Sequence, residues 1–358
     1  MSSIKDVAKL AGVSISTVSN VLNKSKYVSP ELVKRVEKAV KELSYEVNPI
    51  ARSMKNNKTG MIGVITEDIC GVFYPYVIKG ISSVAREKGY QVIICDAQNI
   101  TVDKEVMRRE EELFRRLVIN QVDGIIFVSA VPEEIKKKYL EKLKKMANQK
   151  KKIPLVSIER DFSEEGIDSV YFDSYHNAIM AVQHLIDCGC RHICHISGPM
   201  DMQIARERVR GYRKCMKDNG LSADKSMIEF GDYSHQSGYK GALHLLQRHP
   251  EVDGIFCSND QMAVGALKAL KDQGKKIPEE IKLMGYDNVF VGSVVEPSLS
   301  TIHIRKRHTG IEAAKILFRR IEETEKELKP VAIKMEGSLV VRRSTVRKDR
   351  AKEKIMEW

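Results

Sequence analysis

Apolar positions in the first 23 residues recur with the period of a helix. In the opening stretch they lie three and four residues apart, at Ile4, Val7, Ala8 and Ala11, and this spacing predicts an amphipathic helix. Ser3 can cap that helix, and Asp6 follows three residues later, as in a capping box. Gly12 permits a left-handed turn at the end of the helix, and Ser14 is placed to cap a second one.

The second predicted helix has two different faces. The core side is apolar and consists of Val18, Val21 and Leu22. The opposite side, which we call the recognition face, consists of Ile15, Ser16 and Asn20. Ser29 and Pro30 open a third helix, with proline at the first helical position. Two short helices joined by a glycine-containing turn are typical of a helix-turn-helix, which lays its second helix in the major groove of DNA.

From Met61 onward the pattern changes to short apolar runs that alternate with long amphipathic stretches. The runs predict strands at 61–66, 91–96, 123–129, 153–158, 192–197, 228–230, 253–258 and 281–286. Helical spacing predicts helices at 76–88, 104–120, 178–187, 205–219 and 263–272, among others. Alternating strands and helices indicate an α/β fold with parallel sheets and helices on both faces. Two sets of about four strands suggest two similar lobes, and a cleft between such lobes is a natural small-molecule site.

These patterns divide the chain into an N-terminal all-α headpiece at 1–47, a hinge helix and linker at 48–59, a two-lobed core at 60–341 and a basic tail at 342–358. Within the core we expect one subdomain at about 60–160 plus 290–322. The other is expected at about 161–289 plus 323–341.

Charge supports contact with a polyanion at the headpiece. The net charge is +12, and residues 1–60 hold 11 Lys or Arg against 5 Asp or Glu. The tail 342–358 holds 7 against 3, so the long middle of the chain is nearly neutral. Positive charge concentrated at an end is typical of nucleic-acid binding.

Other features exclude several classes of protein. No run of 18 apolar residues occurs, and Met1 leads directly into a capped helix, so we expect neither a membrane span nor a secretory signal. Seven cysteines in apolar segments are typical of free thiols in the cytoplasm. The segment 188–195 has the residue types of a zinc site, but in a strand His192 and Cys194 point away from His195, so we expect no metal and no cofactor. The sequence contains no phosphate loop, no nucleophile elbow and no spaced catalytic pair, so no motif in it indicates an enzyme.

The chain resembles the LacI/GalR family of bacterial transcription repressors from about residue 3 to residue 345. In the headpiece and hinge the resemblance rests on Asp6-Val7-Ala8, Ala11-Gly12-Val13-Ser14, Thr17-Val18-Ser19, Val21-Leu22-Asn23, Tyr45, Asn48 and Ala51-Arg52-Ser53. In the body it rests on Arg208-Val209-Arg210-Gly211-Tyr212, Ser258-Asn259-Asp260-Gln261-Met262-Ala263, Gly285-Tyr286-Asp287-Asn288, Leu299-Ser300-Thr301-Ile302 and Arg343-Ser344-Thr345. The resemblance implies a headpiece joined to a periplasmic-binding-protein-like core that binds an effector and dimerises.

The resemblance also implies which residues contact DNA. The recognition face would read bases: Asn20 can bond adenine at two atoms, Ser16 can donate or accept, and Ile15 can only pack, for example on a thymine methyl. Further positions match phosphate contacts, which set register without carrying sequence information. They are Ser14, Thr17, Ser19 and Asn23, and, by a weaker match, Ser3, Tyr27 and Ser29. Helix capping alone would equally account for the three serines Ser3, Ser14 and Ser29.

The hinge is the second implied DNA element, because Met54 stands where the family has a leucine wedged into the minor groove. The alternative is that Met54 only packs against its dimer mate. The residues that accompany it at the hinge are Tyr45, Asn48, Ala51 and Lys55. The hinge segment is too short to be a stable helix alone, so we expect it to order only against a partner.

For the effector, the resemblance implies a site in the cleft built from Arg208, Asn259 and Asp287, with Tyr233 stacking on the ligand. An arginine, an amide and a carboxylate can together bind ligand hydroxyls or carboxylates at fixed geometry. The expected contacts from elsewhere are Phe73, Tyr74, Ser129, Glu159 and Lys306. Surface ion pairing or helix capping is the competing interpretation for any one of these polar residues.

The sequence therefore predicts a dimeric regulator, most simply a repressor, that binds a palindromic operator in double-stranded DNA under the control of a small molecule, with a sugar as the expected effector. Inducer and co-repressor remain equal alternatives. The main alternative function is a sugar-binding receptor of a transport system, which would fit the two-lobed body but would not need the headpiece. An enzyme with an appended headpiece would need a catalytic constellation.

Overall fold

The computed structural model describes residues 2–23, 26–45, 58–97, 104–323 and 329–347. The chain forms two compact units, residues 1–60 and residues 61–358. The predicted fold class, an all-α headpiece followed by an α/β core of parallel sheets, is confirmed. No helix among the described residues is long and apolar enough to cross a membrane.

The first unit contains α1 (Ile4–Ala11), α2 (Ile15–Asn23) and α3 (Pro30–Glu42). Its small core forms around Val7, Val18 and Val36, none of which is exposed to solvent. Gly12 ends α1 in the left-handed conformation, with φ of 63°, a backbone geometry that glycine adopts without a steric penalty. The turn between the first two helices therefore follows directly from the sequence.

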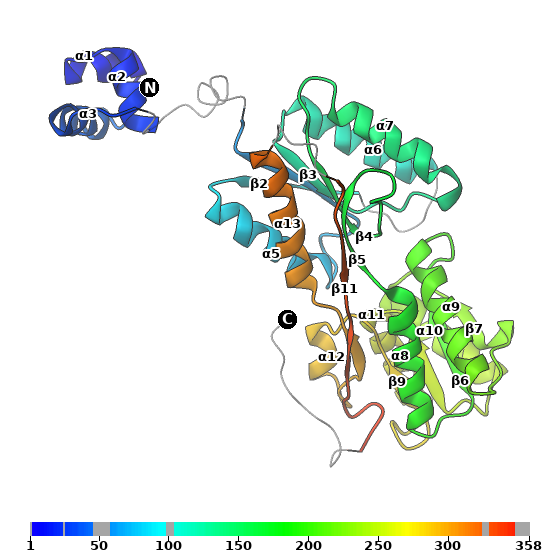
Figure 1. Cartoon of the computed structure of the whole chain (residues 1–358). Helices are drawn as coiled ribbons and strands as arrows, with labels where there is room; N and C mark the ends of the chain where they lie inside the picture. The colour runs from blue at the N-terminus through cyan, green and yellow to red at the C-terminus, as the bar shows by residue number, and fades with distance from the viewer. Residues whose placement is uncertain (1, 24–25, 46–57, 98–103, 324–328, 348–358) are drawn as a thin grey trace. The chain divides into compact units, whose positions relative to one another are not determined.

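The larger unit contains two sheets. The first sheet has the strand order β11-β5-β4-β3-β1-β2, and its neighbouring strands are all parallel. The strands are β1 (Met61–Thr66), β2 (Gln91–Asp96), β3 (Gly124–Phe127), β4 (Leu155–Glu159), β5 (Asp168–Phe172) and β11 (Ala332–Met335). We call this sheet, with its helices, the N-lobe; it lies toward the top of the core in Figure 1.

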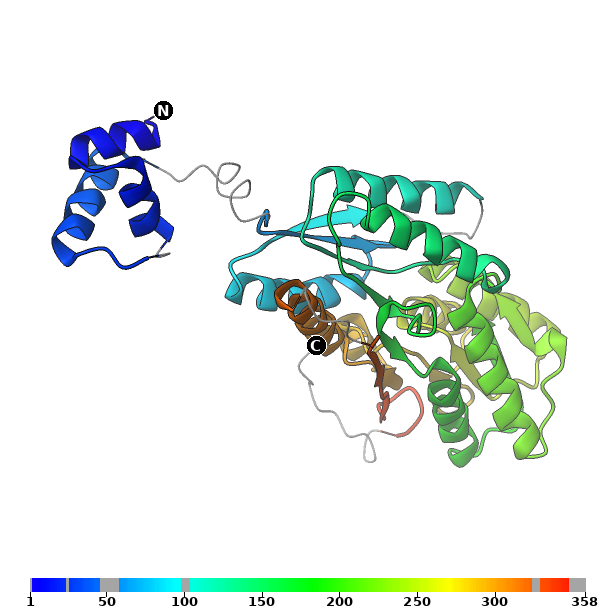
Figure 2. The ribbon, with the colours of Figure 1, turned by 45° about the horizontal axis from the view of Figure 1, so that its top comes forward.

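Alternate residues of these strands feed two separate apolar layers in the N-lobe. On one face Ile126 and Val156 pack against α5 (Tyr74–Glu87) and α13 (Lys306–Glu322). On the other face Ile125 and Phe127 pack against α6 (Lys104–Ile119) and α7 (Lys136–Ala147), and the short helix η1 (Glu133–Ile135) precedes α7. Figure 2 shows the sheet between these two helix layers.

The second sheet, in what we call the C-lobe, has four parallel strands in the order β7-β6-β8-β9. They are β6 (Ile193–Ser197), β7 (Ile228–Phe230), β8 (Gly254–Cys257) and β9 (Lys282–Met284). One face packs on α8 (Ser174–Asp187) and α9 (Gln203–Asp218), and the other on α10 (His235–Arg248) and α11 (Asp260–Asp272). The remaining C-lobe elements are η2 (Lys225–Met227), α12 (Phe290–Val294) and the antiparallel pair β10 (Thr301–His303) and β12 (Ser338–Val340).

The lobe division differs from the expected one. The sequence places 161–289 and 323–341 together, but β5 and β11 both belong to the N-lobe sheet. An ion pair stabilises this edge of the sheet: Arg320 donates to both carboxylate oxygens of Asp168, over 2.6 and 2.7 Å, and the Val331 amide donates to the same carboxylate. Conversely, α12 and β10, within the expected N-lobe segment 290–322, lie with the C-lobe elements.

Candidate functional site

The recognition face lies on the side of α2 away from the headpiece core. Ile15 is 45% exposed and Ser16 is also exposed, while Asn20 is half-buried. On the opposite side Val18 is fully buried. The helix therefore presents the predicted face, although its hydrogen-bonding capacity is confined to a serine and an asparagine.

Two of the candidate phosphate contacts also cap helices. The Asp6 amide donates to Ser3 Oγ over 3.3 Å, and the Ser3 amide donates to Asp6 Oδ2 over 2.8 Å, which completes the predicted capping box. The hydroxyl of Ser14 accepts from the amide of Thr17 over 3.1 Å and lies 2.9 Å from the Thr17 hydroxyl. Ser29 precedes α3, but its side chain makes no capping hydrogen bond.

The other expected DNA contacts are distributed over the headpiece surface and beyond it. Tyr27 is 90% exposed, Ser19 is half-buried, and Tyr45 packs on the headpiece core. Asn23 ends α2. The expected hinge contacts Asn48, Ala51, Met54 and Lys55 lie outside the described residues.

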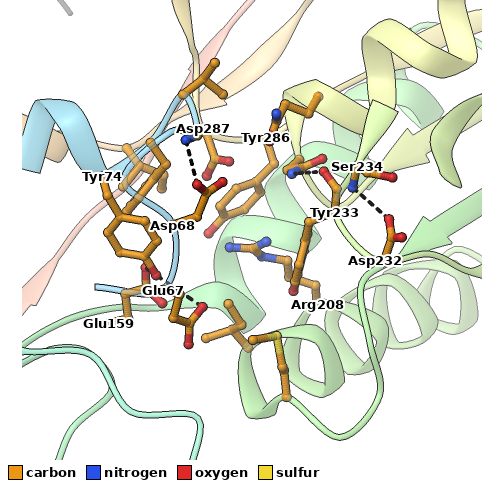
Figure 3. Close-up of a pocket in the computed structure, with 18 of the residues that line it drawn as sticks. Glu67, Asp68, Tyr74, Glu159, Arg208, Asp232, Tyr233, Ser234, Tyr286 and Asp287 are labelled. Carbon is orange, nitrogen blue, oxygen red and sulfur yellow. Dashed lines mark hydrogen bonds between the residues drawn. The ribbon is translucent and has the colours of Figure 1, made fainter. Parts of the chain in front are cut away.

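Within the larger unit, a cavity of about 680 Å³ is lined by residues of both lobes. Its wall contains seven of the nine expected effector contacts: Phe73, Tyr74, Glu159, Arg208, Tyr233, Asn259 and Asp287. Phe73 and Tyr74 lie at the start of α5, Glu159 ends β4, and Arg208 lies on α9, so the cleft joins segments that are far apart in the sequence. Figure 3 shows Tyr74 and Glu159 on one side of the cleft, across from Arg208 and Tyr233.

Arg208 is the only basic side chain among the described residues of the cleft lining, and it is 6% exposed. Its Nη1 donates to the Ser258 carbonyl over 2.7 Å, and its guanidinium carbon lies 3.9 Å from the centroid of the Tyr286 ring. Its Nε has no hydrogen-bond partner. Because an unsatisfied buried donor is costly, this atom is a candidate contact for an acceptor on a bound ligand.

Tyr74 connects two carboxyl groups across the N-lobe side of the cleft. Its hydroxyl lies 2.8 Å from Glu159 Oε1 and 3.3 Å from Glu67 Oε2. Burial raises the pKa of Glu159 to about 7, and it raises the pKa of Glu67 well above its ordinary value, with the neighbouring Glu159 and Glu110 adding to the effect. Both shifts favour the protonated, neutral form of these carboxyl groups.

Asp287 and Tyr233 both occupy unusual backbone conformations at the cleft wall. Their φ angles are 101° and 67°, in the region that non-glycine residues rarely adopt. Burial raises the pKa of Asp287 to about 6, against the opposing effects of Arg208 and Lys306. The buried hydroxyl oxygen of Tyr233 has no hydrogen-bond partner. Such strain is typical of residues held for function.

Asn259 has a structural role in the cleft wall. Its Oδ1 accepts from the Met262 amide over 2.8 Å and so caps α11, while its Nδ2 donates to the Tyr233 carbonyl over 2.9 Å. The same amide therefore fixes both the start of a C-lobe helix and the loop that carries Tyr233.

Two of the expected effector contacts, Ser129 and Lys306, do not lie in the cleft lining. Ser129 is 2% exposed, and its hydroxyl donates to Glu110 over 3.1 Å. Lys306 is 1% exposed, and its ammonium donates to the carbonyls of Asp287 and Asn288 over 2.5 and 3.1 Å. Both side chains are occupied by the protein itself, and Lys306 stabilises the loop that carries Asp287.

Sequence reasoning missed other polar and aromatic residues of the lining. They are Glu67, Asp68, Asp96, Phe172, Ser174, Asp232, Ser234, Gln236, Gln261 and Tyr286. Their common signal is position: Glu67 and Asp68 follow β1, Asp96 ends β2, and Asp232 follows β7. Ligands bind at the carboxyl ends of parallel strands, so the polar residues at those ends were the available indication.

No group of three or more His, Cys, Asp or Glu side chains that could hold a metal occurs in the described part of the chain. Cys190 and Cys194 are buried, and burial raises the pKa of each thiol to about 12. His195 Nδ1 lies 2.9 Å from the Phe256 carbonyl oxygen. These side chains belong to the C-lobe core.

Two family models match the chain. The model described as bacterial regulatory proteins, lacI family, matches residues 3–48, and the model of a periplasmic binding protein-like domain matches residues 182–345. The HTH-type transcriptional repressor PurR of Vibrio atlanticus is 32% identical over 347 residues, which are 97% of this chain and 99% of the relative. The ribose operon repressor of Halalkalibacterium halodurans is 33% identical over 345 residues, 96% of this chain and 97% of the relative.

Solved structures of two transcriptional regulators are also similar to this chain. The Lac repressor dimer bound to operator and the anti-inducer ONPF has a TM-score of 0.85 at 25% identity, with 96% of this chain and 99% of the other covered. The complex of the transcriptional regulator CelR with cellobiose has a TM-score of 0.69 at 29% identity, with 96% and 100% covered.

Proposed function

This chain belongs to the lacI family of bacterial regulatory proteins, and from that premise we propose that it represses transcription as a homodimer on a palindromic operator, under the control of a small molecule, most simply a sugar, in the cleft. As a member of this family it is a DNA-binding regulator and not an enzyme. One observation carries the proposal: the chain joins a recognition face on the outer side of α2 to a cleft in which Arg208 Nε and the Tyr233 hydroxyl are buried without partners.

The recognition face supports a dimer on a palindrome. One headpiece offers only Ser16 and Asn20 for hydrogen bonds to bases and Ile15 for apolar contact. Each mismatched base pair typically costs about 1–3 kcal/mol, and a genome offers a great number of competing sites. Two headpieces on two half-sites double the specific contacts, and bending of the operator adds further discrimination. Its DNA target places the protein in the cytoplasm.

The cleft supports control by a small polar molecule. Aromatic rings of Phe73, Tyr233 and Tyr286 line it together with carboxyl groups and one guanidinium. Rings pack on the apolar faces of a sugar, while the polar groups bond its hydroxyls. A ligand that contacts both lobes favours one angle between them, and any effect of the ligand on DNA affinity must be matched by an equal effect of DNA on ligand affinity.

The DNA-binding part of the proposal is tested with the full-length chain by selection of bound sequences from a random duplex pool, followed by binding measurements on the selected duplex. We expect a selected palindrome, and an affinity that falls by orders of magnitude between 50 and 200 mM salt. Binding that shows no sequence preference or no salt dependence would contradict the proposal and would favour a solute receptor.

Two headpiece variants test the assignment of contacts. Asn20→Ala should relax base preference at one position of each half-site, because it removes a base contact. Thr17→Ala should weaken binding to all sequences alike, because it removes a phosphate contact. If both variants lowered affinity uniformly, the recognition face would be wrongly assigned.

The ligand part is tested by thermal-shift screening against sugars and nucleobases, since a ligand that binds the native state raises its apparent stability. A stabilising ligand should also change the affinity for the selected operator. A rise in affinity would identify a co-repressor, and a fall would identify an inducer. Stabilisation with unchanged operator affinity would contradict control through the cleft.

A further inference from the structure

The cleft has an unusual charge balance. Its described lining contains six carboxyl side chains, Glu67, Asp68, Asp96, Glu159, Asp232 and Asp287, against the single guanidinium of Arg208. Some of these carboxylates have structural uses: Asp68 Oδ1 accepts from the amides of Cys70 and Gly71, and Asp232 Oδ1 accepts from the Ser234 amide. Glu67 and Glu159 have no comparable backbone contact among the interactions that the described structure gives.

Glu67 and Glu159 share one phenolic hydrogen. Tyr74 has a single hydroxyl hydrogen, and the 2.8 Å contact with Glu159 Oε1 is the stronger of its two contacts. The 3.3 Å contact with Glu67 Oε2 is then a hydrogen bond only when Glu67 carries a proton and donates it to the Tyr74 oxygen. Within the described residues, no ion pair joins either carboxyl to a Lys, Arg or His side chain.

On the opposite side of the cleft, buried polar atoms of Arg208 and Tyr233 lack partners. Arg208 is 6% exposed and points into the cleft with its Nε unpartnered, and the buried Tyr233 hydroxyl also lacks a partner. The cleft therefore has four of its six carboxyl groups on the N-lobe side and an unsatisfied donor, Arg208 Nε, on the C-lobe side. The two features come from different lobes, and Arg208 lies close enough to Glu159 to oppose the rise in its pKa.

We propose that the effector is a polyhydroxylated amine, such as an amino sugar, whose ammonium group binds between Glu67 and Glu159 and whose oxygen atoms accept hydrogen bonds from Arg208. This inference rests on the proposed effector function of the cleft and specifies the class of ligand. An ammonium brings three donors and a positive charge to two carboxyl groups that otherwise share one hydrogen. An anionic ligand would be repelled by the surrounding carboxylates, and a neutral sugar would bring no positive charge to them.

Matched sugars that differ at one carbon test the proposal directly. Isothermal titration of the full-length chain is carried out at pH 7 with the 2-amino, 2-hydroxy and 2-acetamido forms of glucose, galactose and mannose. We expect the amine of at least one series to bind at least about tenfold tighter than its hydroxyl and acetamido partners, consistent with a charge-assisted contact. Equal or tighter binding of the neutral forms, or no binding of any amine, would overturn the proposal.

Substitution of the two carboxyl groups localises the effect. Glu67→Gln and Glu159→Gln should each lower affinity for the amine by about tenfold and leave the neutral partner within about twofold, because only the charge is removed. Glu279→Gln, an exposed carboxyl outside the cleft, is the matched control and should not change either affinity. Thermal unfolding of each variant shows whether the fold is retained; a folded pair of variants with unchanged amine affinity would also overturn the proposal.

The number of protons released when the amine binds is a measurement that a change in packing alone would not alter. Glu67 faces Tyr74 on α5, Glu159 and Arg160 near β4, and Glu110 on α6. Arrival of a cation should displace a proton that the buried carboxyl groups of Glu67 and Glu159 hold, so the heat of amine binding should depend on the ionisation enthalpy of the buffer, and this dependence should become smaller in Glu67→Gln. Failure here is distinguishable from failure of the proposed function: a neutral sugar that binds and changes operator affinity would support the regulator while overturning the amine.

Discussion

Arg160 in the N-lobe donates a hydrogen bond from Nε to Oε1 of Gln203 in the C-lobe, over 2.8 Å. Arg160 is 8% exposed and follows Glu159, while Gln203 begins α9, the helix that carries Arg208. Beside this bond, Ala130 of the N-lobe packs against Met202 of the C-lobe. The two lobes are thus joined at the rim of the cleft, by side chains whose neighbours line it.

Gln203→Ala should favour opening of the cleft. Because the bond exists only when the lobes are close, its loss removes the net contribution of one hydrogen bond, about 0.5–1.5 kcal/mol after exchange with water. We therefore expect ligand affinity to fall about three- to tenfold, and small-angle scattering to show a larger radius of gyration for the ligand-free variant. Gln273→Ala, at the exposed end of α11, is the control. An unchanged radius and affinity would mean that Arg160–Gln203 does not hold the lobes together.

Lys306→Met should destabilise the protein and weaken ligand binding. Lys306 bonds the carbonyls of Asp287 and Asn288, two consecutive residues with positive φ, and it lies close to the buried carboxyls of Asp287 and Asp260. Removing one partner of a buried charge network costs about 3–5 kcal/mol, which urea unfolding would measure. Lys315→Met removes an exposed lysine from the same helix and should cost under about 0.5 kcal/mol. Equal midpoints for the two variants would refute this role.

The prediction of Lys306 as a ligand contact illustrates the limit of sequence reasoning about the site. A lysine near a cleft is compatible with a ligand contact, and only its burial and its bonds to two carbonyls place it behind the wall. Of the seven expected residues that do line the cleft, Arg208, Asn259 and Asp287 lie in the family-like motifs, and the other four were expected from the resemblance alone. Glu67 and Asp68 were missed because a polar residue at the end of a strand carries no periodic signal.

The sequence predicted those parts of the fold that local patterns of apolar residues determine. Apolar runs in the sequence located eight strands, β1 to β4 and β6 to β9, because buried parallel strands are continuously apolar. β5 begins with Asp168 and β11 contains Lys334, so neither reads as an apolar run. Their place in the N-lobe sheet depends on the distant ion pair between Asp168 and Arg320, which no local pattern encodes.

Glu110→Gln should make stability less dependent on pH. Glu110 is 1% exposed, its Oε1 has no partner, and burial raises its pKa to about 8, although Ser129, Tyr139 and Arg160 oppose the shift. The unfolded chain releases this proton at a pKa of about 4.3, so the folded state binds more protons between about pH 4.3 and 8, and stability falls as pH rises through that window.

The variant should match the wild type at pH 4.5 and exceed it at pH 8.5 by at most about 5 kcal/mol, at 1.36 kcal/mol per pKa unit. Chemical denaturation at several pH values measures the difference. Glu159, Asp260 and Asp287 also have raised pKa values, so some slope should persist. Glu112→Gln, an exposed carboxyl on the same helix, should follow the wild-type curve, and a wild-type slope in Glu110→Gln would show that Glu110 is ionised in the folded state.

Ser14→Asp separates the two roles of Ser14. Its hydroxyl accepts from the Thr17 amide and so caps α2, and aspartate caps a helix as well as serine does while its charge suits the helix N-terminus. Thermal stability of the variant should therefore match or exceed that of the wild type, whereas Ser14→Ala should lose about 1 kcal/mol.

Binding to the selected operator should instead fall at least about tenfold in Ser14→Asp, because a carboxylate in place of the hydroxyl repels the phosphate that the family match assigns to this position. Ser44→Asp adds the same charge at an exposed headpiece residue beyond the end of α3 and should retain most of the affinity. If Ser14→Asp kept wild-type affinity, capping alone would account for Ser14, and the phosphate contacts of the headpiece would have to come from the other predicted positions.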